Sequence, residues 1–401
     1  MANGLQRLAD FGQSVWYDNI SRAVLENGSL ASLVVAGEVH GVTSNPAIFE
    51  KAIGGGSDYD ADIRRLWAEG KRGEPLYEAL AIGDIVAGAD VLRPVFDRTG
   101  GADGYISLEV SPGLADDTAG TIAEALRLRG LLPRPNIMIK IPATPAGWPA
   151  IEECTAQGLC INVTMMFALQ HYDRVADAYM RGLERRLAKG LPLERIRGVA
   201  SVFVSRFDVL VDRLLEAKVQ AAGSAAERER LAGLLGKSAL ANAKLTYERF
   251  RQTFNGPRWA HLAAAGANLQ RPLWASTSTK NPAYRDVLYA EQLIGPDTVD
   301  TMPPQTIDAF RDHGEVARTV DTGLPEARRV VAELDAVGID LERVGAQLQA
   351  EGVAAFSTAF EKMLRELQQK AERLDGTPPG AGRGGRAGTG VAAGGGRETA
   401  G

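Results

Sequence analysis

A repeated alternation of short apolar runs with longer stretches of helical period constrains the fold most. Eight apolar runs are predicted to be β-strands: SVWYDN, GVTSN, YISLEV, NIMIKIPA, LCINVTM, VASVFVS, PLWAST and TVDTMP. Between most of them, apolar residues recur at helical spacing. Strands that alternate with helices are typical of a parallel sheet, and about eight such units favour a closed (β/α)8 barrel over an open doubly wound sheet. We therefore expect an α/β protein with the TIM-barrel fold and extra helices.

The 401 residues are consistent with a single barrel domain, because insertions can lengthen this fold considerably. A long helical region over residues 225–254 is expected on the outer ring. A last packed helix is expected to end near Leu374, with one apolar face made of Val353, Phe356, Phe360, Met363, Leu364 and Leu367. Residues 376–401 hold 11 glycines, three arginines and one acid, so we expect a domain over 1–375 and a disordered Gly/Arg-rich tail. The GAGRGG in this tail follows no strand and is interpreted as a chance match to a dinucleotide-binding motif.

Charge and composition exclude several classes of function. The 45 Lys and Arg against 50 Asp and Glu give a net charge of -5, which provides no basic footprint for a nucleic acid. The N-terminal segment is polar, and no apolar run is long enough to span a membrane, so we expect a cytoplasmic protein with no membrane partner. Cys154 and Cys160 are expected to be reduced packing residues. No metal site is expected, because the four histidines lack metal-binding spacing: His40, His171, His261 and His313.

Polar side chains at the carboxyl ends of the predicted strands are the candidate site, because active sites of this barrel form there. The strongest is Lys140, a lysine between Ile139 and Ile141. Burial can lower the pKa of a lysine, and a neutral amine can attack a carbonyl to form a Schiff base. The alternatives are a buried ion pair with Glu109, or a packed lysine stem whose head reaches the barrel mouth.

Two carboxyl groups can supply the proton chemistry that a Schiff base requires. Glu109 can serve the loss and return of water at the carbinolamine. Asp18 lies on another strand and can take a different proton, such as that of a hydroxyl released during carbon–carbon cleavage. The alternative for Asp18 is the N-cap of the helix predicted in ISRAVLENG.

Two basic residues are candidates for a phosphate site. Arg206 follows the sixth predicted strand at the start of a helical run, where a phosphate could meet a guanidinium and helix amides. Lys280, in ASTSTKNP after the seventh strand, can add a second positive charge. The alternative for Arg206 is a surface ion pair with Asp208.

In six ordered blocks the sequence resembles the transaldolases, in their longer bacterial subfamily. The blocks are GVTSNPAIFEKAI, YISLEVSP, IMIKIPAT, GLCINVTMMF, ASVFVSRFDVLVD and RPLWASTSTKNPAYRDVLYAEQLIGPDTVDTMPPQTI. The resemblance implies a Schiff-base transferase that moves a dihydroxyacetone unit from sedoheptulose 7-phosphate to glyceraldehyde 3-phosphate. The products are erythrose 4-phosphate and fructose 6-phosphate, within the non-oxidative pentose phosphate pathway. No cofactor or metal is implied, since the protonated imine itself accepts the electrons.

The resemblance also implies roles for individual residues. Lys140 would attack the ketose, Glu109 would act through a water positioned with Thr164, and Asp18 would take the hydroxyl proton. The implied substrate-binding residues are Asn45, Asn162, Ser201, Phe203, Arg206, Ser276 and Lys280. The better-known subfamily has an arginine two positions after the serine that corresponds to Ser276, where this chain has Ser278, so Lys280 would supply that charge.

Two rival functions stay open at this point. One is a Schiff-base fructose 6-phosphate aldolase built from the same residues, and the other is a non-catalytic barrel that binds sugar phosphates. The sequence indicates no oligomeric state.

Overall fold

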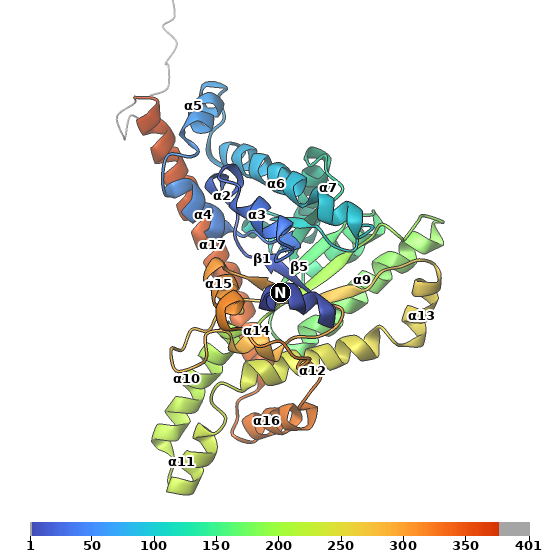
Figure 1. The fold of residues 1–401 in the computed structure, drawn as a ribbon, viewed down its shortest axis with the longest axis vertical. Coiled ribbons are helices and arrows are strands. Elements are labelled where there is room, and N and C mark those ends of the chain that lie inside the picture. The colour runs from blue at the N-terminus through green and yellow to red at the C-terminus, as the bar shows by residue number, and fades with distance from the viewer. Residues whose placement is uncertain (1, 377–401) are drawn as a thin grey trace, which may run out of the picture.

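The computed structural model describes residues 2–376, and it contains a closed barrel of eight parallel strands in chain order (Figure 1). The predicted TIM-barrel fold is confirmed, and each predicted run contributes a strand. The predicted tail lies outside the described residues from 377 onward. The strands are β1 (Gln13–Tyr17), β2 (Gly41–Val42), β3 (Ile106–Glu109), β4 (Ile137–Pro142), β5 (Ile161–Met166), β6 (Gly198–Phe203), β7 (Gln270–Ala275) and β8 (Thr298–Met302).

The helices form an outer ring and several extensions, of which α10 and α11 project furthest from the barrel at the lower left of Figure 1. Their bounds are α1 (Gly4–Arg7), α2 (Arg22–Glu26), α3 (Ser29–Val35), α4 (Pro46–Gly54), α5 (Asp60–Ala68), α6 (Gly73–Arg98), α7 (Thr118–Leu131), α8 (Gly147–Ala156), α9 (Leu169–Ala188), α10 (Ser205–Ala221), α11 (Ala225–Ala232), α12 (Ser238–Thr253), α13 (Pro257–Ala264), α14 (Leu288–Gln292), α15 (Pro304–His313), α16 (Leu324–Ala336) and α17 (Leu341–Leu374). Two short 3-10 helices are η1 (Leu8–Phe11) and η2 (Pro112–Leu114).

The prediction of one long helical region over residues 225–254 is wrong in one respect, because the chain turns between α11 and α12. Gly236 in this turn has a φ of +69°, a left-handed conformation that glycine adopts without strain. Its amide donates to the Asp212 carboxylate at 2.9 Å, and a side chain at this position would meet the ring of Tyr284. The turn therefore anchors the two helices to α10.

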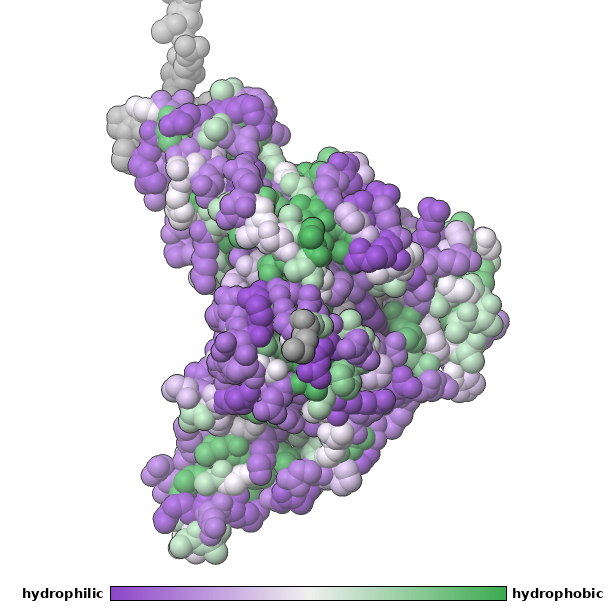
Figure 2. All heavy atoms as spheres, viewed as in Figure 1, coloured by the Kyte–Doolittle hydropathy of each residue, from purple (hydrophilic) through white to green (hydrophobic). Residues whose placement is uncertain are grey.

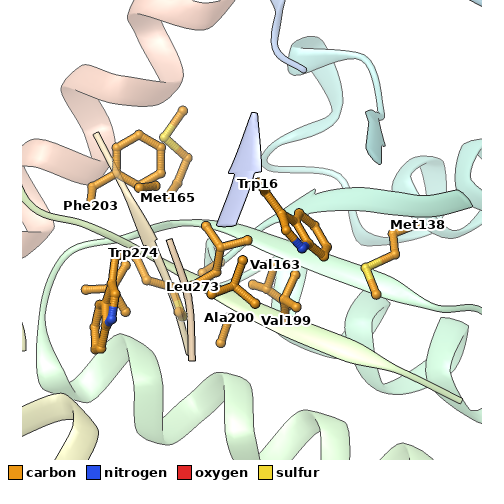
Figure 3. Packing of buried hydrophobic residues seen from close by; sticks show 14 of the residues in the cluster. Trp16, Met138, Val163, Met165, Val199, Ala200, Phe203, Leu273 and Trp274 are labelled. Carbon is orange, nitrogen blue, oxygen red and sulfur yellow. The ribbon is translucent and has the colours of Figure 1, made fainter. Parts of the chain in front are cut away.

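Side chains close the amino-terminal end of the barrel. The indole of Trp16 fills the interior (Figure 3) and donates to Asp103 at 2.9 Å. Asp103 lies 3.6 Å from Arg271 at the start of β7. A Cβ atom on Gly41 would lie 2.5 Å from the Trp16 ring, so the neighbouring strand needs glycine here. With this end filled, a cavity can form only at the carboxyl ends of the strands.

The long helix α17 crosses that open end. It stops at Leu374 as expected but begins at Leu341, earlier than expected. Gln349 donates to the carbonyl oxygens of Ala143 and Met165, both at 2.9 Å, and so joins the helix to the ends of β4 and β5. Gly352 allows the close approach, because a Cβ there would lie 2.9 Å from the Met165 sulfur. In Figure 3 the helix passes beside Met165 and Phe203.

The remaining findings concern the surface and the sulfur and metal chemistry of residues 2–376. The face drawn in Figure 2 is mostly hydrophilic, with scattered apolar patches. None of the helices in this range is both long and apolar enough to cross a bilayer. Cys154 and Cys160 are free thiols, and burial raises the pKa of each. The same range holds no group of three or more His, Cys, Asp or Glu side chains placed to hold a metal.

Candidate active site

A cavity of about 580 Å3 opens at the carboxyl end of the barrel, and the structure brings most of the predicted site residues to its wall. These are Asp18, Asn45, Lys140, Thr164, Ser201, Phe203, Arg206, Ser276 and Lys280. Glu109 and Asn162 do not line this cavity. They lie directly beside Lys140 in the sheet, because β3 and β5 flank β4 and place both residues in register with it.

Lys140 and Glu109 form the buried centre of the site. Their charged groups are 3.1 Å apart, and their side chains are only 6% and 8% exposed. Lys140 Nζ also donates to the carbonyl oxygen of Ser44 at 3.0 Å. Burial raises the pKa of Glu109 more than the adjacent lysine lowers it. The ion pair considered as an alternative is present, and it places an acid within proton-transfer distance of an amine that faces the cavity.

Next to Lys140, a row of hydrogen bonds fixes Asn162 in the barrel interior. Asn162 receives a hydrogen bond from Ser201 at 2.8 Å and donates to Ser107 at 2.9 Å. Thr164, two residues further along β5, is fully buried, and its hydroxyl has no hydrogen-bond partner among the described residues. A buried hydroxyl without a partner is costly, so its place in the cavity wall is consistent with use by a ligand or a water.

Asp18 follows β1 at the cavity wall. Its carboxylate accepts a hydrogen bond from Thr43 at 2.6 Å, and Thr43 lies 2.6 Å from the Thr301 hydroxyl. Burial raises the pKa of Asp18, although Thr43 and the charges of Lys140, Lys280 and Arg206 oppose the rise. The helix-capping alternative is wrong, because Ser21 caps α2. Asp18 is therefore available as an acid or base inside the cavity.

Asn45 serves both the fold and the cavity. Its side-chain oxygen caps α4 by accepting from the amide of Ile48 at 3.0 Å. Its side-chain nitrogen forms no hydrogen bond with any described residue, while the residue lines the cavity. The cap holds this nitrogen in place as a donor for a ligand.

Arg206 and Lys280 give one part of the cavity wall a positive charge. Arg206 lies in the first turn of α10, above the Phe203 ring at 5.5 Å, and forms no salt bridge within residues 2–376. The Arg206–Asp208 alternative is wrong, since Asp208 instead accepts from Ser238, Tyr289 and a backbone amide. Lys280 donates to Ser278 at 2.7 Å. Burial and the charge of Arg206 lower the pKa of Lys280, which indicates two cations close together.

The backbone beside this region is strained. Ser276 has a φ of +58°, and its hydroxyl lies 2.8 Å from that of Ser205 at the start of α10. Met165 has a φ of +61° where the β5–β6 register shifts. Non-glycine residues with a positive φ cluster at functional sites. Both residues lie at the carboxyl end of the barrel.

Sequence reasoning missed several cavity residues. Thr43 and Thr301 hold Asp18 in place. Lys51 on α4 adds a third cation near Lys280. Phe356 on α17 places its ring 5.8 Å from Lys140 Nζ. The block GVTSNPAIFEKAI already contained Thr43 and Lys51, and their polar character within it was an available signal. Phe356 was predicted to be buried, but nothing in the helical period showed which part of the barrel it would cover.

A TIM barrel with a lysine–carboxylate pair at the closed end of a polar, cation-rimmed cavity defines a Schiff-base-type lyase or transferase site. The sequence profile of the Transaldolase/Fructose-6-phosphate aldolase family matches residues 15–367. The chain therefore belongs to this family, and the resemblance seen in the six blocks is confirmed.

Individual members of the family are similar in sequence to this chain over nearly their full lengths. Transaldolase 1 of Streptomyces coelicolor is 48% identical over 372 residues, which cover 92% of this chain and 96% of that protein. A transaldolase of Trichodesmium erythraeum is 43% identical over 376 residues, or 93% and 99% of the two chains. A transaldolase of Thiobacillus denitrificans is 45% identical over 356 residues, or 89% and 97%.

Proposed function

We propose that this chain is a transaldolase, a transferase that moves a dihydroxyacetone unit between ketose and aldose phosphates through a Schiff base on Lys140. The single observation that carries the proposal is the position of the Lys140 amine. It faces a cavity of about 580 Å3 and lies 3.1 Å from a carboxyl group that can exchange protons with it. The proposed reaction converts sedoheptulose 7-phosphate and glyceraldehyde 3-phosphate into erythrose 4-phosphate and fructose 6-phosphate.

The proposed steps use the amine and the two carboxyl groups of the site. Lys140 attacks the ketose carbonyl carbon, and Glu109, with a water positioned by Thr164, supplies the proton that removes the carbonyl oxygen. Asp18 then takes the proton of the C4 hydroxyl as the C3–C4 bond breaks. The electron pair of that bond moves into the imine and leaves a three-carbon enamine on Lys140.

Further residues of the cavity wall, together with Asn162 beside Lys140, hold the substrate in this scheme. Asn45, Asn162 and Ser201 bind the hydroxyl groups of the dihydroxyacetone unit. Arg206 and Lys280 bind the phosphate, with Ser276 beside them. The guanidinium is suited to this task because it is charged and has no fixed anionic partner.

The enamine must persist until an aldose arrives, because protonation would release free dihydroxyacetone. Phe356 places its ring 5.8 Å from Lys140 Nζ, and Phe203 adds a second apolar ring to the same wall; we infer that these rings limit the access of water to the enamine. This enclosure favours transfer over the fructose 6-phosphate aldolase reaction, which uses the same residues.

Borohydride reduction in the presence of fructose 6-phosphate tests the proposal. A reduced three-carbon or six-carbon adduct is expected on Lys140, located by peptide mass spectrometry. A protein that yields no adduct on Lys140 would be at most a sugar-phosphate-binding barrel. If free dihydroxyacetone forms as fast without erythrose 4-phosphate as with it, the activity is that of an aldolase.

The phosphate site gives a prediction of its own. Arg206→Ala should raise KM for fructose 6-phosphate and so lower kcat/KM, because one charge-assisted contact is lost. The loss corresponds to about 1.5–3 kcal/mol of binding free energy. Arg213→Ala, an exposed arginine on the same helix, is the matched control and should leave KM unchanged. An equal KM in the two variants would remove Arg206 from the phosphate site.

We also propose that residues 1–375 form the complete catalytic domain and that the protein acts in the cytoplasm without a nucleic-acid partner. A chain shortened to end at Asp375 should keep the kcat and KM of the full chain in a steady-state assay of the transferase reaction, because α17 ends at Leu374. A loss of activity on shortening would assign a role to the Gly/Arg-rich segment.

A further inference from the structure

A second, smaller cavity lies on the other side of the Lys140–Glu109 pair. Its volume is about 30 Å3, which is room for one or two water molecules. Glu109 lines this small cavity and not the main one, whereas Lys140 lines the main cavity and not the small one. Because the two groups are 3.1 Å apart, the ion pair forms part of the boundary between the two spaces, and Asn45 lines both.

The small cavity leads toward a different part of the surface from the substrate opening. Its walls include Glu74, Glu78, Ser111 and Glu124, which also line an open depression between α6, η2 and α7. At the rim of this depression Arg127 forms ion pairs with Glu78 and Glu124. The small cavity and the depression therefore share part of their walls on this side.

The helix α17 contributes to the walls of both spaces. Phe356 lines the main cavity, and Phe360, one turn later, lines the small one. The Phe360 ring meets the Tyr77 ring edge-on at 5.3 Å, and Tyr77 meets Phe49 in the same way at 5.7 Å. These aromatic contacts fix the position of Tyr77 in the wall of the small cavity.

Two residues that line the small cavity, Glu109 and Tyr77, have hydrogen-bonding capacity that no described residue uses. Glu109 Oε2 is buried and, although it is near Lys140 Nζ, receives no well-directed hydrogen bond. The Tyr77 hydroxyl, the second group, forms no hydrogen bond within residues 2–376. Burial and the charges of Glu109, Glu74 and Glu78 raise the pKa of Tyr77, which keeps it a neutral donor. A water-sized space bounded by an acceptor and a donor is a site for ordered water.

We propose that this small cavity is the path by which water leaves and reaches Glu109 while the sugar fills the main cavity. The inference rests on the proposed Schiff-base function. In imine formation the Lys140 nitrogen bonds to the ketose carbonyl carbon, and the carbon–oxygen bond breaks. The oxygen departs as water, with one proton from the amine and one from the Glu109 carboxyl, and leaves a protonated imine and a carboxylate. Hydrolysis reverses each step.

The separate path resolves a conflict in the chemistry. The imine cannot form or hydrolyse without water, but water at the enamine carbon ends the transfer. A path behind Glu109 delivers water to the carboxyl side of the pair, while Phe203 and Phe356 place apolar rings on the wall of the main cavity. Tyr77 is a positioning residue in this path, since it holds water for Glu109 and touches no substrate.

Oxygen exchange tests the path. Fructose 6-phosphate is incubated with the full chain in 18O-labelled water without an aldose acceptor, and label at C2 is followed by mass spectrometry. Ala81→Val places two methyl groups in the small cavity, whose wall includes Ala81. The Ala81→Val variant should exchange label about tenfold or more slowly, because water no longer reaches Glu109 through the small cavity and proton transfer by this carboxyl group is impaired. The amount of Lys140 adduct trapped at equilibrium should stay the same.

The matched control is Ala89→Val, since Ala89 is also a buried alanine of α6 but does not line the cavity. It should exchange label at the wild-type rate. Tyr77→Phe, which keeps the ring and removes the hydroxyl, should also slow exchange and serves if the valine variant does not fold. Wild-type exchange in folded Ala81→Val or in Tyr77→Phe overturns the path. The absence of any Lys140 adduct in the unaltered chain would instead overturn the proposed function.

Discussion

The barrel wall and the helical ring around it both bury ionisable side chains, but they use them differently. In the helical ring, Asp208 accepts three hydrogen bonds, from Ser238 at 2.6 Å, Ala239 at 2.7 Å and Tyr289 at 2.8 Å. Inside the barrel, Glu109 Oε2 has only the charge of Lys140 beside it, at 3.1 Å, and Thr164 Oγ1 has no hydrogen-bond partner among the described residues. Burial raises the pKa of both Asp208 and Glu109, so a raised pKa alone does not distinguish a site from a structural contact.

The difference lies in unused hydrogen-bonding capacity. A carboxylate whose oxygens are occupied by fixed donors holds helices together and has nothing left for a ligand. Groups that remain unpaired next to a cavity are costly to the fold and are explained by what they bind. Unpaired polar atoms also occur away from the cavity, at Thr155 and Tyr172 in the helical ring and at Asp300 on the face of β8 opposite to the cavity residue Thr301, so an unpaired atom marks the site only where a cavity lies beside it.

The largest expected effect separates two buried lysines. Lys140→Met should lower transferase activity by at least about 10^4-fold and abolish borohydride trapping, because the nucleophile is lost. Lys244→Met is the matched control, since Lys244 is also buried but donates to the carbonyl of Thr322 far from the cavity. It should keep full trapping, measured by intact mass after reduction. Trapping that survives in Lys140→Met would place the nucleophile elsewhere.

Much of the fold could be predicted from local sequence patterns. The eight strands were found because each is a short apolar run, and Lys140 stood out as a charge inside one of them. The length of β2 could not be predicted, because its two residues pair through contacts that only the closed barrel makes. The end of α17 was predictable from its period, whereas its start was not.

Most of the predicted site residues line the cavity or lie beside Lys140, but their arrangement could not be predicted. Glu109 was expected to face the substrate space, yet it lies behind Lys140, because side-chain direction depends on barrel closure. The support of Asp18 by Thr43 and Thr301 needs β1, β2 and β8 to meet, which no local pattern reports. Phe356 reaches the cavity from a helix more than 200 positions after Lys140 in the sequence.

The next effect concerns Asp300. Burial raises the pKa of Asp300 to about 7, and the hydrogen bond from Thr277 at 3.0 Å offsets this only in part. Because the folded pKa lies above the ordinary value of 3.8, folding favours the protonated acid. The protonated Asp300 side chain contributes fully to the free energy of unfolding below about pH 4. This contribution, which is up to about 4 kcal/mol, is lost as the pH rises to about 7.

Asp300→Asn should remove this part of the pH dependence, because the amide is neutral throughout and can still accept from Thr277. Urea unfolding from pH 4 to 8 measures the free energy of unfolding of both proteins. As the pH rises to about 7, the free energy of unfolding of the variant should increase relative to that of the unaltered chain. The activity per folded molecule should not change. Parallel curves for the two proteins would show that Asp300 does not titrate in this range.

The smallest expected effect compares a hydroxyl of the cavity with one of the helical ring. Thr164→Val removes a buried hydroxyl that has no partner, so the free energy of unfolding should change by less than about 0.5 kcal/mol or rise. Ser238→Ala removes a donor from buried Asp208 and should cost about 1–3 kcal/mol. Activity should show the reverse order, with Thr164→Val slower by about tenfold in single-turnover imine formation and Ser238→Ala unchanged. Equal losses of stability in the two variants would mean that Thr164 is held by the fold, and unpaired polar atoms would then cease to mark this site.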